Sequence, residues 1–513
     1  MPGDSLTVAE TLRRQARSRG AHPLLVCDDE RISYAEADRR SAELARGLIA
    51  RGAGKGTHVG LLYPNGAEFV VGMLAAARIG AVVVPFSTFA TARELREQLV
   101  DSDTEILLAT PSFRSHDYLR RLAEVLAHAD LDSDDRLFVP ATPQLRHVVL
   151  HPERAHRLAG DVDPALLAAM ENDVDGCDLL AIVYTSGSTS APKGVMHTHA
   201  GLLGHQRNLN DIRGLTAADR LFCNSPFFWI GGFAFGLLAT LVAGSTLVCS
   251  NATDAGETLD LLEAEKPTIT NGFAAGIAHL AEHPSFPRRD LSSMRRGNLY
   301  PIMAPGARPA DPELRHNMLG LTEAGSVVLI SGDESDQPEV RRGSFGKPAP
   351  GFDTMIVEPD ASGVGGLCIR GPYVMQGYCK RSREECFDAD GWFHTGDLVR
   401  ADADGFFYFV GRISGMIKTA GANVSAAEVE KAIAKVTGAE AHVMGIPDAQ
   451  RGELVVAVVA QPDLDEVALR ERLKEELSSY KIPKRFVALA PAEVPLLSSG
   501  KVDAKRLRKL FDD

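Results

Sequence analysis

An apolar run followed by a loop rich in glycine and hydroxyl groups is the feature that most constrains the fold of this chain. The run covers residues 179–183, and the loop continues through Lys193 to Gly194. A buried strand before such a loop suits a polyphosphate or an acyl phosphate, because glycine lets backbone N–H groups turn toward an anion while hydroxyls and lysine add donors. The loop is not a Walker A sequence, since Pro192 stands where that motif has glycine. Such a loop is more often a plain solvated connection, but its flanking residues favour phosphate binding.

Alternating helical and strand patterns surround this loop. A capping box at Ser33 and Glu36 starts one helix, and Gly80 closes another. The predicted helices cover 33–48, 72–78 and 236–242, and the predicted strands cover 59–63, 81–85 and 245–248. Strands that alternate with helices predict layered α/β subdomains.

The C-terminal third of the chain has a different pattern. Over residues 340–412, short apolar strands alternate with Gly-rich turns, which predicts a β-barrel-like subdomain at the end of the large domain. Beyond it we expect a small mobile α+β domain with helices over 425–436 and 467–477 and strands over 441–444 and 454–460. The predicted division is therefore a large domain over 1–411, a hinge over 412–414 and a small domain over 415–513.

Composition excludes several classes of protein. The net charge of -13 argues against a nucleic-acid partner. No apolar run approaches the roughly 20 residues of a membrane span, and the N-terminus has no signal pattern. The seven cysteines are scattered without disulfide or metal spacing, so we expect reduced thiols in a cytoplasmic protein.

Four charged residues have the chemistry of a nucleotide site. Glu323 is a carboxylate that can hold Mg²⁺, and Asp397, at a tight turn, suits the two hydroxyls of a ribose. Arg412 can form charge-assisted bonds to a phosphate. Lys501 can reach a reacting carboxylate or phosphate if the small domain swings over the large one. A residue of any of these types is, by itself, more often a surface charge. The four together indicate a nucleotide site more specifically.

In this order, and with their flanking residues, these features resemble the acyl-adenylate-forming superfamily. That superfamily includes acyl-CoA synthetases, adenylation domains of peptide synthetases and beetle luciferases. The matching segments span nearly the whole chain and include residues 371–378, 411–418, 427–430 and 498–501. The pattern is most similar to actinobacterial ligases for medium or bulky acids, including those for diterpenoid acids.

The resemblance implies a two-step reaction with ATP, Mg²⁺ and coenzyme A. A carboxylate attacks the α-phosphate of ATP, and the thiol of coenzyme A then attacks the acyl carbon and releases AMP. The resemblance implies catalytic roles for Lys501, Glu323 and Thr322, with Mg²⁺ held by Glu323 and Thr185. It implies a nucleotide site of Thr185, Ser186, Gly187, Ser188, Thr189, Lys193, Leu319, Gly320, Leu321, Asp397 and Arg412.

The resemblance also assigns residues to the acid and to the second step. It implies an acyl pocket with Trp229, Gly231, Gly232 and Phe273, although these aromatic residues could simply fill core. Lys418 and Gly421 would belong to a small-domain loop that enters the site for thioester formation, and Ser414 would be the hinge. Glycine at 421 would leave room for the pantetheine arm.

The departures from the family pattern lie mainly around the nucleotide. Ser190 stands where the family has glycine, and Ala304-Pro305-Gly306-Ala307 replaces the usual Gly-Gly-Ala segment. Leu319 replaces the tyrosine that stacks on adenine, and losing such a stack costs roughly 1–3 kcal/mol. Ser414 and Trp229 also differ, since the family usually has an acid or lysine and a histidine there.

Three hypotheses for the function follow. In the first, the chain is a complete acyl-CoA ligase for a hydrophobic acid. In the second, it performs only the thioester step, on an acyl-adenylate that a separate adenylating ligase supplies. The third is a non-catalytic nucleotide-binding relic, which the retained Lys501 disfavours. A separate carrier protein in place of coenzyme A also stays open.

Overall fold

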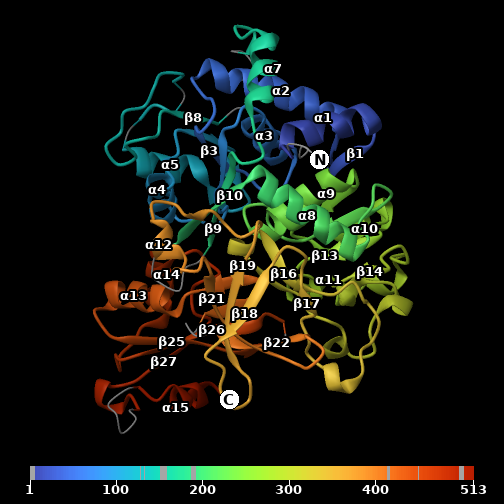
Figure 1. The fold of residues 1–513 in the computed structure, drawn as a ribbon. Helices are drawn as coiled ribbons and strands as arrows, with labels where there is room; N and C mark the ends of the chain where they lie inside the picture. Colours follow the sequence, from blue (N-terminus) through green and yellow to red (C-terminus); the bar gives the residue numbers. More distant parts are fainter. Residues whose placement is uncertain are drawn as a thin grey trace.

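A computed structural model describes residues 6–127, 129–131, 133–150, 159–185, 192–412, 416–448, 450–495 and 502–512. Two large sheets form the first part of the chain, drawn blue to green in Figure 1. One has seven strands, in the order β20 (Gly377–Tyr378), β10 (Lys193–Thr198), β9 (Leu179–Thr185), β4 (Val82–Pro85), β3 (His58–Leu62), β5 (Ile106–Ala109) and β8 (His147–Val149). The strands from β9 to β8 are parallel, and β10 runs antiparallel to β9.

The second sheet has six strands and is parallel except at one edge. Its order is β14 (Arg296–Gly297), β13 (Ile269–Asn271), β11 (Arg220–Cys223), β12 (Thr246–Cys249), β1 (Pro23–Cys27) and β2 (Glu30–Ser33). The helices around the two sheets are α1 (Val8–Arg19), α2 (Tyr34–Ala50), α3 (Ala67–Arg78), α4 (Ala92–Asp101), α5 (Tyr118–Leu126), α7 (Pro164–Asp173), α8 (His199–Arg213), α9 (Ala239–Ala243), α10 (Ala255–Glu265) and α11 (Ala278–Ala281). These layers confirm the predicted α/β class.

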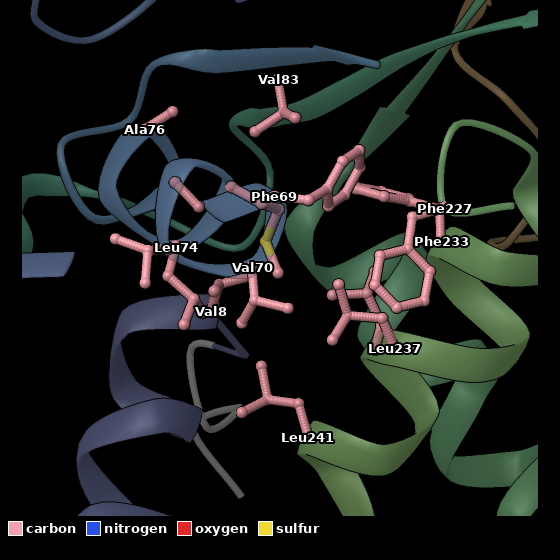
Figure 2. Close-up of a cluster of buried hydrophobic side chains, with 14 of the residues drawn as sticks. Val8, Phe69, Val70, Leu74, Ala76, Val83, Phe227, Phe233, Leu237 and Leu241 are labelled. Atoms are coloured by element: carbon pink, nitrogen blue, oxygen red, sulfur yellow. The ribbon is translucent and has the colours of Figure 1, made fainter. Parts of the chain in front are cut away.

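A continuous apolar core joins the two sheets. Phe69 of α3 packs edge-on against Phe227 and Phe233, with ring centroids 5.3 and 6.3 Å apart (Figure 2). Val8 of α1 and Leu241 of α9 extend the same cluster. Because edge-to-face aromatic pairs add to the burial of apolar area, this cluster holds the layers that carry the cavity described below.

The helix predicted over 236–242 begins earlier than expected. Residues Gly231–Leu238 form a π-helix, η1, which continues into α9. Nearly every side chain of η1 is buried, so its sequence lacks the one-sided apolar pattern of a surface helix. The helix predicted from residue 72 likewise begins at Ala67, because its first turn is buried and Gly66 offers no side-chain cap.

Residues 319–412 form two antiparallel sheets. The first contains β15 (Leu319–Leu321), β16 (Ser326–Ile330) and β17 (Lys347–Pro348); the second contains β18 (Asp353–Val357), β19 (Gly365–Arg370), β21 (Phe393–Ala401) and β22 (Phe407–Arg412). Residues 344–346, which lead into β17, bond to β22 through an antiparallel bridge from Ser344 to Tyr408 and backbone hydrogen bonds at Phe407, so the two sheets continue into one another. The short helix α12 (Arg383–Cys386) follows β20.

The small C-terminal domain, orange to red in Figure 1, is an α+β unit with its own core. Its elements are β23 (Ile417–Thr419), β24 (Ala422–Val424), α13 (Ala426–Thr437), β25 (Ala441–Asp448), β26 (Gly452–Val459), α14 (Glu466–Glu476), β27 (Arg485–Ala488) and α15 (Ala504–Arg508). Both predicted helices and both predicted strands are confirmed, with bounds shifted by a few residues. All seven cysteines are unpaired. Within the described ranges, no helix is long and apolar enough to cross a membrane.

Candidate active site

One cavity of about 970 Å³ brings together most of the residues predicted from the sequence. It lies where the large domain faces the small one, with Thr185 at the end of β9 and Lys193 at the start of β10. The predicted residues that line it are Thr185, Lys193, Trp229, Gly231, Phe273, Leu319, Gly320, Leu321, Thr322, Glu323, Asp397, Arg412, Lys418 and Gly421. The predicted residues Ser186, Gly187, Ser188, Thr189, Ser190, Ser414 and Lys501 lie outside the described residues.

Glu323 is held by a tyrosine that the sequence analysis did not assign. The Tyr378 hydroxyl donates a 2.7 Å hydrogen bond to Glu323 Oε1, and the Lys193 ammonium lies 5.0 Å from the centre of the Tyr378 ring. Burial, together with the Glu323 charge, raises the pKa of Tyr378, so its hydroxyl stays protonated and donates. Burial lowers the pKa of Lys193. The signal for Tyr378 was present, since it ends the 371–378 motif.

Asp397 and Arg412 form a buried ion pair on two neighbouring strands. They are register partners in β21 and β22, and Arg412 Nε lies 2.5 Å from Asp397 Oδ1. Asp397 is 1% exposed, so its charge needs this partner. Burial opposes the charge of Arg412, but the bond to Asp397 outweighs it and raises the pKa of the guanidinium. A fixed carboxylate and a fixed guanidinium therefore face one end of the cavity.

Aromatic side chains from both domains surround the other end. Trp229 lies edge-on to Phe273, with ring centroids 6.0 Å apart, and to Tyr480 of the small domain at 6.4 Å. Gly231 lines the cavity as predicted, whereas Gly232 is not among the described lining residues. A Cβ at Gly232 would lie 2.1 Å from the Pro226 carbonyl oxygen. Close backbone packing therefore explains this glycine, and the predicted role in making room for the acid is corrected.

The hairpin between β23 and β24 places Gly421 against the aromatic end. Gly421 has φ +84°, and an added Cβ would lie 2.3 Å from Phe273 Cγ. Lys418 of β23 also lines the cavity, and burial lowers its pKa. The hairpin tip thus enters the cavity as the sequence analysis expected of the thioester-step loop.

A buried cluster of charges holds the small domain against α4. Lys481 Nζ lies 2.7 Å from Glu94 Oε1 and 2.8 Å from Glu428 Oε1. The Ser478 hydroxyl donates to Glu94 Oε2 at 2.6 Å, and the same carboxylate completes the capping box of α4 with Thr91. Sequence analysis missed Glu94, Lys481 and Tyr480, because nothing local to them indicates that the two domains meet there.

Comparisons with known proteins show the family of this chain. Residues 12–379 match the family model of AMP-binding enzymes, and residues 428–501 match the AMP-binding enzyme C-terminal domain. The 3-[(3aS,4S,7aS)-7a-methyl-1,5-dioxo-octahydro-1H-inden-4-yl]propanoyl:CoA ligase of Mycobacterium tuberculosis is 32% identical over 537 residues, 99% of this chain and 100% of that protein. A feruloyl-CoA synthase of Amycolatopsis sp is 32% identical over 500 residues, 94% of each chain.

A solved structure gives the same result for the fold. The o-succinylbenzoate CoA synthetase of Bacillus subtilis, a double mutant bound with a product analogue, superposes with a TM-score of 0.73 at 25% identity, covering 97% of this chain and 98% of that one. The chain therefore belongs to the AMP-binding enzymes, in their acyl-CoA ligase branch.

Proposed function

We propose that this protein joins a hydrophobic carboxylic acid to coenzyme A through an acyl-adenylate. The observation that carries the proposal is one cavity in which Asp397 and Arg412 face one end while Gly421 touches Phe273 at the other. A nucleotide and an acyl group can therefore meet beside a loop of the small domain. Membership of the acyl-CoA ligase branch supports an acid–thiol ligase and the use of ATP.

In the first step, a carboxylate oxygen bonds to the α-phosphorus of ATP and pyrophosphate leaves. Asp397 would accept hydrogen bonds from the ribose hydroxyls, and Arg412 and Lys193 would bind phosphate oxygens. Lys501 would stabilise the negative charge that develops at the reacting phosphate. Thr322 and the glycine-containing segment 320–321 would position the adenylate.

Glu323 and Thr185 fit the proposed Mg²⁺. Both line the cavity, and the Tyr378 bond occupies only one oxygen of the Glu323 carboxylate. Protein Mg²⁺ sites commonly use one or two carboxylates, with waters and substrate phosphates as the other ligands. The ion would neutralise phosphate charge, while Tyr378 fixes the orientation of the carboxylate.

In the second step, the thiol sulfur of coenzyme A bonds to the acyl carbon, AMP leaves and the thiol proton is released. The β23–β24 hairpin would line the path of the pantetheine arm, with Lys418 and Gly421 beside it. We place the domain boundary at 412–414, with Ser414 as the hinge, because Lys501 is assigned to the first step and the β23–β24 hairpin to the second, so the small domain would present each of them in turn.

The thioester-only reaction is a second candidate. Leu319 lines the cavity where the family usually has an aromatic shelf for adenine, so nucleotide binding loses a stacking contact. Pyrophosphate exchange with the acid and thioester formation from a supplied acyl-adenylate separate the two candidates. Rapid exchange contradicts the thioester-only reaction, and thioester formation without exchange contradicts the complete ligase. Absence of both contradicts the proposed function.

For the substrate we propose an acid with a bulky ring system. The aromatic walls formed by Trp229, Phe228 and Phe273 suit such a body. Relatives at 32% identity are named for a bicyclic propanoic acid and for ferulic acid. Thioester formation across aliphatic, aromatic and polycyclic acids tests this choice, and a preference for unbranched aliphatic acids would contradict it.

A further inference from the structure

Two polar residues lie at the aromatic end of the cavity. Asn271 is the last residue of β13, and its register partner on the parallel strand β11 is Cys223. Ser225 follows Cys223 by two positions, and both Ser225 and Asn271 line the cavity. Because the two strands are parallel neighbours in register, both residues lie at the same edge of the sheet.

The amide of Asn271 differs from the two other asparagine amides nearby. Asn298 exchanges two hydrogen bonds with the backbone of Gly272, at 2.8 and 3.1 Å. Asn224 exchanges two with the backbone of Phe273, at 2.9 and 3.0 Å. In the described residues, Asn271 makes one side-chain hydrogen bond, a weak one from Nδ2 to Cys223 Sγ at 4.0 Å. Its carboxamide oxygen is therefore available to a ligand.

The Ser225 side chain also lacks a hydrogen-bond partner among the described residues. It is 1% exposed, and its hydroxyl makes no hydrogen bond with any described residue. A Cβ on Gly231 would lie 3.3 Å from Ser225 Oγ, so Gly231 packs against this hydroxyl, which is buried behind the wall and does not face the cavity. Buried polar groups are nearly always paired, and of the two side chains it is the Asn271 carboxamide that a ligand can reach.

The position of Asn271 indicates which part of a substrate would reach it. Asn271 also lines a second, smaller cavity, and it shares that wall with Phe235 and Met318. Asp397 and Arg412 line the main cavity only. Asn271 therefore lies in a part of the cavity wall that does not include the ion pair assigned to the adenylate.

We infer that Asn271 selects acids whose hydrophobic body carries a hydroxyl or carbonyl oxygen at the end remote from the carboxylate; this inference rests on the proposed function. A carboxamide can accept from a hydroxyl through Oδ1 or donate to a carbonyl through Nδ2. A site built to hydrogen-bond a substrate oxygen rejects the analogue that lacks it, because its own polar groups are then left unpaired.

The test uses matched pairs that differ by one oxygen. They are 3-phenylpropanoic and 3-(4-hydroxyphenyl)propanoic acid, and 3-(indan-4-yl)propanoic and 3-(1-oxoindan-4-yl)propanoic acid. Each is supplied as an unreactive acyl-sulfamoyl adenosine, and its Kd is measured by calorimetry on the full chain. We expect the oxygenated member of at least one pair to bind about 10-fold or more tightly than its partner.

Asn271→Leu should bring that ratio to about 1 by weakening the oxygenated ligand and leaving the other within about threefold. Met318→Leu, an apolar change in the same wall, should shift both members of a pair by the same factor. Asn271→Ala, a smaller change at the same position, should also lower the ratio, and it tests the inference alone if Asn271→Leu does not fold.

A wild-type ratio near 1 for both pairs overturns the inference, as does a ratio that survives both Asn271→Leu and Asn271→Ala. Thioester formation is measured separately with the free acids, ATP and coenzyme A. Because calorimetry needs no turnover, loss of thioester formation contradicts the proposed function while the binding ratio still decides the role of Asn271.

Discussion

The Lys481 ammonium of the small domain lies 2.7 Å from the carboxylate of Glu94, which also caps a helix of the large domain. Lys481 is 4% exposed and Glu94 is 5% exposed, so neither charge is solvated by bulk water. Burial opposes the Lys481 charge, but Tyr480 and the two carboxylates outweigh it and raise its pKa. The orientation that brings Gly421 to Phe273 therefore depends on a buried charge cluster.

Lys481→Met should weaken this orientation. The change leaves Glu94 and Glu428 buried without their cation, and removing one partner of a buried pair costs about 3–5 kcal/mol. Trp229 reports the loss, because its indole lies 6.4 Å from Tyr480. In a Trp392→Phe background, which leaves Trp229 as the only tryptophan, we expect a red shift of the emission and a lower urea midpoint.

The matched control is Arg39→Met, which removes the pair between Arg39 and Glu43 on the exposed face of α2. Exposed i,i+4 pairs contribute about 0.3–0.5 kcal/mol, so Trp229 emission and the midpoint should barely change. Equal effects of Lys481→Met and Arg39→Met would contradict the importance of the buried cluster.

Neutralising either of the two carboxylates around Lys481 should change the free energy of unfolding, but in opposite directions. Burial raises the pKa of Glu94, but Lys481 and its other hydrogen bonds outweigh it, and the net pKa lies below the ordinary 4.5. Its stabilisation is therefore complete above about pH 4.5 and is lost as pH falls through the lower folded pKa. Burial and the Glu94 charge raise the pKa of Glu428 despite Lys481, so its ionised form is disfavoured in the fold.

Glu94→Gln should accordingly lower the free energy of unfolding at pH 7 and flatten its acid dependence. Glu428→Gln should leave the free energy of unfolding at pH 7 unchanged or raise it. Urea unfolding from pH 3 to pH 8 measures both. A larger loss at pH 7 for Glu428→Gln than for Glu94→Gln would contradict the assignment.

Gly421→Ala should impair thioester formation selectively. The added Cβ would meet the Phe273 ring at 2.3 Å, and φ is +84°, so the hairpin tip must move. Displacements of about 1 Å near a reacting centre can cost about 100-fold in rate, and we expect a loss of that size with supplied acyl-adenylate and coenzyme A. Pyrophosphate exchange should change much less.

Gly438→Ala is the control for backbone strain. Gly438 has φ +76°, and an added Cβ there would meet nothing within 4 Å. It should cost about 1–2 kcal/mol of stability and leave thioester formation unchanged. A normal thioester rate in Gly421→Ala would show that the hairpin has no role in that step.

Continuous apolar runs made β3, β4 and β9 predictable, because strands buried on both faces are uniformly apolar. The same uniformity made η1 unpredictable, because a helix buried on every side shows no alternation of apolar and polar residues along the sequence. At the site, Glu323, Asp397 and Arg412 were found through motifs. Glu94 and Lys481 were not, because a contact between residues so distant in sequence depends on how two finished domains dock.

Tyr378→Phe should impair the first step. The substitution removes the 2.7 Å hydrogen bond to Glu323 and keeps the aromatic ring that the Lys193 ammonium contacts. Hydrogen bonds to charged groups contribute about 1.5–3 kcal/mol, which corresponds to about 10- to 100-fold in pyrophosphate exchange. Tyr408→Phe removes a similar 2.9 Å bond to Asp402, and Tyr408 is not among the described residues that line the cavity. Of the two carboxylates, Glu323 is assigned to Mg²⁺ and Asp402 is not, so raising the Mg²⁺ concentration should restore part of the exchange in Tyr378→Phe. An equal loss of exchange in Tyr408→Phe would contradict the role of Tyr378.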